Sequence, residues 1–189
     1  MKRIVLFASG SGSNVENIEQ YFRDNSEVSI SCVLSNKKDA KVFERCNRLN
    51  LNALYFNRHA FYGSDCVLNI LKSLNPDLIV LAGFLWKIPD NLIRSYPNKI
   101  INIHPALLPK YGGKGMYGMH VHEAVKNNNE TETGITIHYV NENYDEGAII
   151  KQAKVALSPN DTPEMIAEKV HQLEYGHFPK VIDQVLMGT

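Results

Sequence analysis

The chain has 189 residues, of which 44% are hydrophobic and 21% are charged. That composition is typical of a globular protein, and the length suffices for one well-buried core. Twenty basic and 20 acidic side chains give a formal net charge of zero, which disfavours DNA or a long RNA as a partner because such polyanions need a basic surface.

Short apolar runs alternate with amphipathic stretches through the first half of the chain. The predicted strands are Arg3–Ala8, Val28–Leu34, Ala53–Phe56, Asp77–Ala82 and Ile100–His104. The predicted helices between them are Asn14–Arg23, Ala40–Leu49, Asp65–Leu74 and Asp90–Tyr96. Because runs such as Leu78–Ala82 are apolar on both faces, as central parallel strands are, the alternation predicts an α/β sheet with right-handed crossovers.

The pattern changes in the second half of the chain. A predicted helix, His120–Asn127, leads to Gly134–Val140, where polar and apolar residues alternate as in a half-exposed strand. A second such strand, Ala148–Leu157, follows a turn at Asp145–Gly147, and the two strands are predicted to form an antiparallel extension. The last helix is predicted to start at Asp161–Glu164, which supplies a capping residue, a proline and an acid.

No linker or internal repeat divides the sequence, so we expect one domain over residues 1–189. Its three cysteines, Cys32, Cys46 and Cys66, are too widely spaced for a disulfide framework or a metal-binding pair. The apolar run at Ile4–Ala8 is too short for a signal peptide, and no window has the length of a membrane span. We therefore expect a cytoplasmic protein with no membrane association.

A glycine-rich loop, FASGSGSN at residues 7–14, joins the first predicted strand to the first helix. Backbone N–H groups and the positive end of a helix meet at such a junction and favour a phosphate. The dinucleotide fingerprint fails, because Val15 replaces its third glycine and Ser35 and Asn36 stand where an acid is required. A monophosphate is the favoured ligand, and a tight turn without any ligand is the alternative.

Two polar side chains end the predicted strand Ile100–His104. Asn102 and His104 are two residues apart and therefore face the same way, at the carboxyl edge where open α/β sheets bind ligands. Together they could hold an oxyanion; alternatively, they only bond to nearby backbone and end the strand. No serine or cysteine stands beside them as a nucleophile. His120 and His122 fall on different faces of a helix, and no metal site is expected.

Four segments, SGSGSN, LAGF, NIHPALLPKYGG and YDEGAII, occur in the order and at the spacing found in glycinamide ribonucleotide (GAR) formyltransferases. The chain resembles that family over nearly its whole length. The resemblance implies a Rossmann-like formyltransferase fold, with a GAR phosphate-binding half at residues 1–100 and a catalytic and folate-binding half at 101–189. It also implies small-molecule substrates and allows a homodimer.

The resemblance further implies the residues of each site. The catalytic residues would be Asn102, His104 and Asp145. The GAR site would contain Gly12, Ser13, Asn14, Glu174 and His171, and the folate site Leu85, Trp86, Lys87, Ile88 and Asn102. The loop Asn141–Gly147 would close over the pterin ring of the folate.

The implied reaction moves the formyl group of 10-formyltetrahydrofolate to the primary amine of GAR, with no metal and no nucleotide cofactor. Asn102 and a protonated His104 would hold the oxyanion. Asp145 would keep His104 charged, because a nearby carboxylate raises the pKa of an imidazole, and would help to pass protons.

The sequence departs from the family in three places. Trp86 stands where many members have a basic residue, and Arg58 is only a candidate to meet the folate tail. The stretch Lys114–Met119 contains extra residues, which form either a longer lid over the folate or a plain loop.

Four other functions compete with this interpretation. Methionyl-tRNA formyltransferase and formyltetrahydrofolate hydrolase share the catalytic core, but each normally carries an additional domain. An oxidoreductase is disfavoured by Val15 and by the missing acid. A catalytically silent nucleotide-binding protein is disfavoured by the set of Asn102, His104 and Asp145.

Overall fold

A single seven-stranded sheet runs through the computed structural model, which describes residues 1–188. The strand order is β3-β2-β1-β4-β5-β6-β7. The strands are β1 Lys2–Ala8, β2 Val28–Ser35, β3 Ala53–Tyr55, β4 Leu78–Leu81, β5 Ile100–His104, β6 Glu132–Tyr139 and β7 Ile149–Ala156. The first five pair in parallel, whereas β6 and β7 add to β5 in antiparallel fashion. The predicted mostly parallel sheet with an antiparallel C-terminal extension is confirmed.

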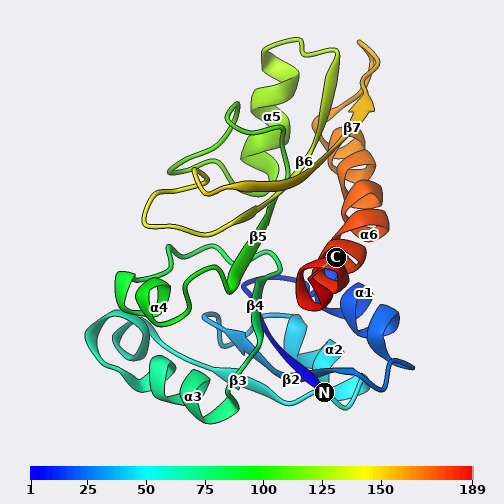
Figure 1. Ribbon diagram of the computed structural model, residues 1–189. Helices are drawn as coiled ribbons and strands as arrows, with labels where there is room; N and C mark the ends of the chain where they lie inside the picture. Colours follow the sequence, from blue (N-terminus) through cyan, green and yellow to red (C-terminus); the bar gives the residue numbers. More distant parts are fainter. Residues whose placement is uncertain (189) are drawn as a thin grey trace.

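Helices cover both faces of the sheet (Figure 1). They are α1 Ser13–Phe22, α2 Val42–Arg48, α3 Cys66–Leu74, α4 Asp90–Ser95, α5 Met119–Asn127 and α6 Pro163–Met187, with one π-helical turn, η1, at His59–Gly63. The turn η1 was not predicted, because five residues are too few to show a period. None of the helices within residues 1–188 is both long and apolar enough to cross a bilayer.

Strand β1 is apolar at every position from Ile4 to Ala8 because it lies between two cores. Ile4 and Leu6 are buried in the core under α1 and α6, whereas Val5 and Phe7 are buried in the core under α3 and α4. An alternating pattern would leave one of these faces polar, so the continuous apolar run is the sequence signature of a two-sided strand.

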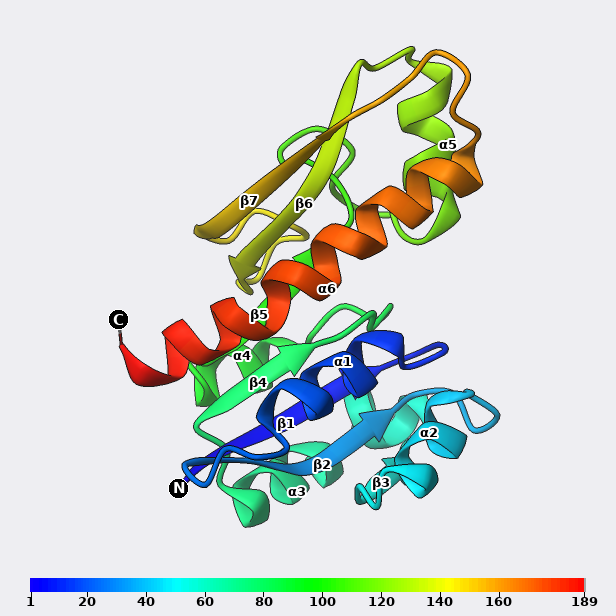
Figure 2. The same ribbon diagram turned by 90° about the vertical axis from the view of Figure 1, so that its right-hand side faces the viewer.

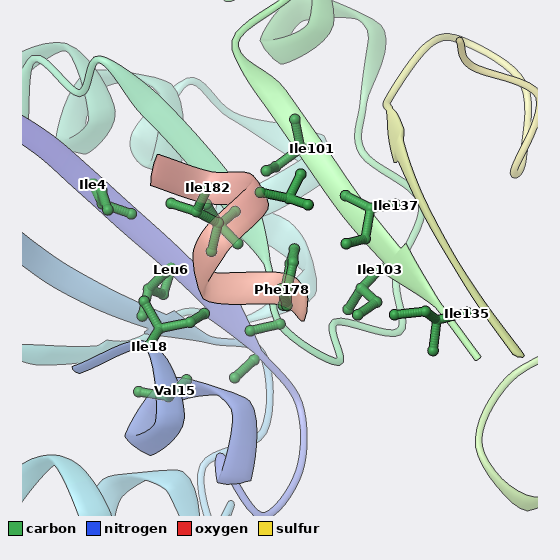
Figure 3. Packing of buried hydrophobic residues seen from close by; sticks show 14 of the residues in the cluster. Ile4, Leu6, Val15, Ile18, Ile101, Ile103, Ile135, Ile137, Phe178 and Ile182 are labelled. Carbon is green, nitrogen blue, oxygen red and sulfur yellow. The ribbon is translucent and has the colours of Figure 1, made fainter. Parts of the chain in front are cut away.

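Helix α6 connects the parallel and antiparallel parts of the sheet. Thr162 caps its N-terminus by accepting a hydrogen bond from the Met165 N–H at 3.3 Å, and Pro163 occupies its first turn. The helix then crosses the sheet beside α1 (Figure 2). Figure 3 shows Phe178 and Ile182 between the apolar side chains of β1 and those of β5 and β6.

The topology places three chain segments at one edge of the sheet. Strand β1 pairs with β2 on one side and with β4 on the other, so the connections that leave β1 and β2 diverge from the one that leaves β4. Ligands bind in the crevice outside the carboxyl ends of the strands at such a switch point. The glycine-rich loop leaves β1 at this edge, residues 83–88 leave β4, and Asn102 and His104 end β5.

Replacing Phe178 with alanine should lower the free energy of unfolding by about 3–5 kcal/mol, because the ring is fully buried between the two parts of the sheet. Urea denaturation followed by circular dichroism measures the change. Met165→Ala is the matched control: it also shortens a large side chain of α6, but that side chain is exposed, and its loss should cost less than about 1 kcal/mol. Equal effects of the two substitutions would contradict the packing described for α6.

Candidate active site

A cavity of about 570 Å³ lies at the carboxyl edge of the sheet and collects every site residue predicted from the sequence. Its wall includes Gly12, Ser13, Asn14, Leu85, Trp86, Lys87, Ile88, Asn102, His104, Asp145, His171 and Glu174. The volume falls within the range of about 300–1,000 Å³ that small-molecule sites occupy. Residues far apart in the sequence therefore meet in one place.

The glycine-rich loop forms one end of the cavity and leads into α1. Gly12 has a φ of 76°, and a Cβ there would come within 2.5 Å of the Val42 side chain, so only glycine fits. Helix α1 begins directly afterwards at Ser13, and no side chain caps its first turn. Its N-terminus is thus available to an anionic ligand.

Asn14 and Glu174 link the first and last helices beside this loop. The Asn14 amide Nδ2 donates to the Glu174 carboxylate at 2.9 Å, while its carbonyl Oδ1 is buried without a hydrogen-bond partner within residues 1–188. Burial raises the pKa of Glu174, against the opposing effects of Asn14 and the nearby His171. Buried polar atoms without protein partners are suited to a polar ligand.

Four side chains that line the cavity form a connected cluster. Asp145 lies with its carboxylate 3.6 Å from Nδ1 of His104 and 3.6 Å from Nε2 of His138, and it accepts a hydrogen bond from the Gly113 N–H at 2.9 Å. The Asn102 amide donates to Nε2 of His138 at 3.1 Å. We call Asn102, His104, His138 and Asp145 the catalytic cluster.

The position of Asp145 depends on a tight passage of the chain just after it. Asp145 itself has a φ of 56°, and at Gly147 a Cβ would lie 1.7 Å from the Tyr139 carbonyl oxygen. Glycine at 147 therefore lets the loop turn back against β6 and bring the carboxylate to the two imidazoles. The chain turns at Tyr144–Asp145 and bends at Gly147, so the turn predicted at Asp145–Gly147 is part of a longer loop over residues 140–148.

Sequence reasoning did not single out His138. It lies on β6 directly opposite Asn102 of β5, and its Nδ1–H donates to the Tyr139 carbonyl at 2.8 Å, which leaves Nε2 free to accept from Asn102. The alternating pattern of Gly134–Val140 places Thr136 and His138 on the polar face, so this signal was available.

One electrostatic expectation is wrong for the free protein. Burial lowers the pKa of His104 below its ordinary value, and this effect outweighs the opposing influence of Asp145 and of the Tyr111 carbonyl. The Nε2–H of His104 donates to that carbonyl at 2.7 Å. Asp145 therefore does not keep His104 charged, because desolvation of the imidazole is the larger effect.

Asp145 itself remains readily ionised. Burial raises the pKa of its carboxyl group. His138, His104 and the Gly113 N–H together lower that pKa by more than burial raises it, so it lies below the ordinary value. The cluster thus holds one carboxylate between two imidazoles.

His122 is a further buried imidazole in the cavity wall. Its Nδ1 has no hydrogen-bond partner within residues 1–188, and burial, aided by the nearby His171 and His104, lowers its pKa to about 4. His120 is exposed beside Glu123, so the two histidines lie on different faces of α5 as their spacing predicts. No group of three potential metal ligands occurs in the described part of the chain.

Residues 85–88 also line the cavity and are fixed from two sides. The Leu85 N–H donates to the Ser9 hydroxyl at 2.9 Å, and the Tyr62 hydroxyl donates to the Lys87 carbonyl at 2.8 Å. Arg58 lies over the rings of Tyr62 and Trp86, at 4.9 and 5.7 Å from their centres. Arg58 is not among the residues that line the cavity, whereas residues 114–118 of the longer loop are.

Comparisons with known proteins agree with this geometry. The family model described as "Formyl transferase" matches residues 2–182. A chloroplastic phosphoribosylglycinamide formyltransferase of Arabidopsis thaliana is 37% identical over 97% of this chain, which spans 65% of that protein's length. The phosphoribosylglycinamide formyltransferase of Bacillus subtilis is also 37% identical, over 98% of this chain and 95% of the relative.

Solved structures show the same likeness. The crystal structure of phosphoribosylglycinamide formyltransferase from Anaplasma phagocytophilum has a TM-score of 0.90 at 30% identity, covering 98% of this chain and 87% of that one. The structure of glycinamide ribonucleotide transformylase 1 from Geobacillus kaustophilus has a TM-score of 0.88 at 34% identity, covering 98% and 99%.

The buried neutral state of His122 should make the protein less stable in acid. Its pKa is about 4 when folded and about 6.5 when unfolded, so the unfolded chain binds a proton first and stability falls as the pH drops below 6.5. Between pH 7.5 and pH 5 this single group should cost about 2 kcal/mol. Urea denaturation at the two pH values measures the loss, and His122→Gln should show a smaller loss than the unaltered protein. An equal loss in both would contradict the assigned pKa.

Proposed function

The chain belongs to the formyl transferase family, and within it to the phosphoribosylglycinamide formyltransferases; from this premise we propose that it transfers the formyl group of 10-formyltetrahydrofolate directly to the amine of 5'-phosphoribosylglycinamide (GAR). The products are formylglycinamide ribonucleotide and tetrahydrofolate, and the reaction belongs to de novo purine biosynthesis.

The observation that supports this proposal best is the single cavity that joins an anion-binding loop to the catalytic cluster. GAR would place its phosphate on Gly12, Ser13 and Asn14, and its ribose hydroxyls toward Glu174 and His171. Its amine would then reach the catalytic cluster in the middle. The folate would occupy the far end, with its pterin ring on the backbone of residues 85–88 and under the loop Asn141–Gly147.

The proposed chemistry begins with attack of the GAR amine on the formyl carbon. A tetrahedral intermediate forms, and its oxygen becomes negative. The Asn102 amide has a second N–H besides the one donated to His138, and we assign this N–H to the oxyanion. The bond between the formyl carbon and N10 of the folate then breaks, while a proton passes from the amine to N10.

His104 and Asp145 would handle the charge and the proton. His104 is buried and its pKa is lowered in the free protein, but an oxyanion beside it would add a second negative charge to that of Asp145. Two negative neighbours favour the imidazolium, so His104 would take up the proton that the attacking amine releases as the oxyanion forms and give it up again to N10. Asp145 would stabilise that imidazolium and help to move the proton from the amine to N10.

Each half of the chain contributes to both substrates in this proposal. Residues 1–100 would supply the phosphate loop and the pterin-binding segment, and residues 101–189 would supply the catalytic cluster and the ribose contacts. The hydrogen bond from Asn14 to Glu174 crosses between the halves.

The purified protein should release tetrahydrofolate from 10-formyltetrahydrofolate only when GAR is present. Absorbance of the deformylated folate measures turnover, and the formylated ribonucleotide is identified by mass spectrometry. Release of folate without GAR would instead indicate a hydrolase, and formylation of methionyl-tRNA in place of GAR would indicate the sibling transferase.

Asn102→Ala and Asp145→Asn should each lower kcat at least about a hundredfold, the size typical of losing an oxyanion donor or a proton-transfer group. Binding of GAR, measured by calorimetry, should persist in both. Asp39→Asn is the control for an acid-to-amide change at an exposed site outside the cavity. Near-normal turnover in either cluster variant would overturn the assigned role.

A further inference from the structure

We propose that Arg45 is a positioning residue that holds the glycine-rich loop in its anion-binding conformation from behind. Arg45 lies on α2 and does not line the cavity. Its Nε–H nevertheless donates to the carbonyl oxygen of Ser11 at 2.7 Å, 34 positions away in the sequence. The inference rests on the proposed function, because it assigns this residue to the binding of the GAR phosphate.

Two consecutive carbonyl groups of the loop are held by residues of α2. The Val42 N–H donates to the Gly10 carbonyl at 3.1 Å, and the Arg45 Nε–H donates to the Ser11 carbonyl. The Val42 side chain also packs against Gly12. The outer side of the loop is therefore fixed at three successive residues.

Because the peptide bond is planar, holding a carbonyl group on the outer side of the loop also orients an N–H group on its inner side. In a trans peptide the C=O of one residue and the N–H of the next point in opposite directions. Because the carbonyls of Gly10 and Ser11 are turned toward α2, the N–H groups of Ser11 and Gly12 are turned away from it. No acceptor for either N–H is found among residues 1–188, and both residues line the cavity. Successive free N–H groups of this kind form an anion-binding concavity.

Arg45 is not available as a free cation for the phosphate. Its guanidinium forms an ion pair with Glu16 of α1, and Arg48 bonds the other carboxylate oxygen of Glu16 at 2.7 Å. The carboxylate neutralises much of the charge and holds the guanidinium against the loop. Arg45 therefore acts through the orientation of the Ser11–Gly12 peptide.

Arg45→Met removes the donor but keeps an unbranched side chain. The KM for GAR should rise about tenfold, the size of losing one charge-assisted hydrogen bond, while kcat and the KM for 10-formyltetrahydrofolate stay within about twofold. Inorganic phosphate, used as a competitive inhibitor, should bind more weakly by a similar factor. Arg45→Lys can still reach the Ser11 carbonyl and should restore most of the affinity. Circular dichroism and thermal melting confirm that each variant is folded.

Arg48→Met is the matched control, because it also removes an arginine from Glu16 but touches no part of the loop. An equal rise in KM in both arginine variants would overturn the proposal, as would a fall in kcat without a change in KM. Glu16→Gln separates orientation from charge: tighter phosphate binding in that variant would mean that Arg45 acts as a cation, and the positioning role would be wrong.

If the unaltered protein shows no turnover with GAR, the proposed function fails, and inhibition by phosphate can no longer be measured. Calorimetric binding of inorganic phosphate to the same variants then tests the role of Arg45 alone.

Discussion

The antiparallel pairing of β6 with β5 is the contact on which the catalytic cluster depends. β5 is the last of the parallel strands and ends with Asn102 and His104. Pairing with β6 sets His138 opposite Asn102 and Thr136 opposite His104. A shift of β6 by one residue in this register would turn His138 to the opposite face of the sheet from Asn102 and His104. The buried Ile101, Ile103, Ile135 and Ile137 on the other face hold the register, because they fill the core under α6.

Much of the fold follows from apolar patterns that the sequence displays directly. The five parallel strands are runs that are apolar on both faces or end at turn residues, and the change to alternating residues at Gly134–Val140 marks the antiparallel strands correctly. Asn102 and His104 could be placed together because two residues on one strand share a face. These inferences need only local spacing.

Contacts between distant segments could not be predicted in this way. The approach of Asp145 to His104 depends on a loop that runs very close to β6: a Cβ at Gly147 would lie 1.7 Å from the Tyr139 carbonyl oxygen. Only the family resemblance suggested this approach. The lowered pKa of His104 depends on how deeply the strand end is buried, which spacing does not reveal. Arg45 looks like an ordinary basic residue of an amphipathic helix until the structure sets it against Ser11.

The cavity combines unpartnered polar atoms with groups that are held rigidly. Oδ1 of Asn14 and Nδ1 of His122 are buried without hydrogen bonds inside residues 1–188, at a cost of about 1–3 kcal/mol each. Around them the backbone is fixed from outside, by Arg45 and Val42 at the glycine-rich loop and by Ser9 and Tyr62 at residues 85–88. A site that folds with unsatisfied polar atoms in a rigid frame gains those bonds only when a matching ligand enters. The free energy that these unpaired atoms cost the protein is recovered when a substrate bonds to them, and it contributes to the affinity and orientation of the substrates.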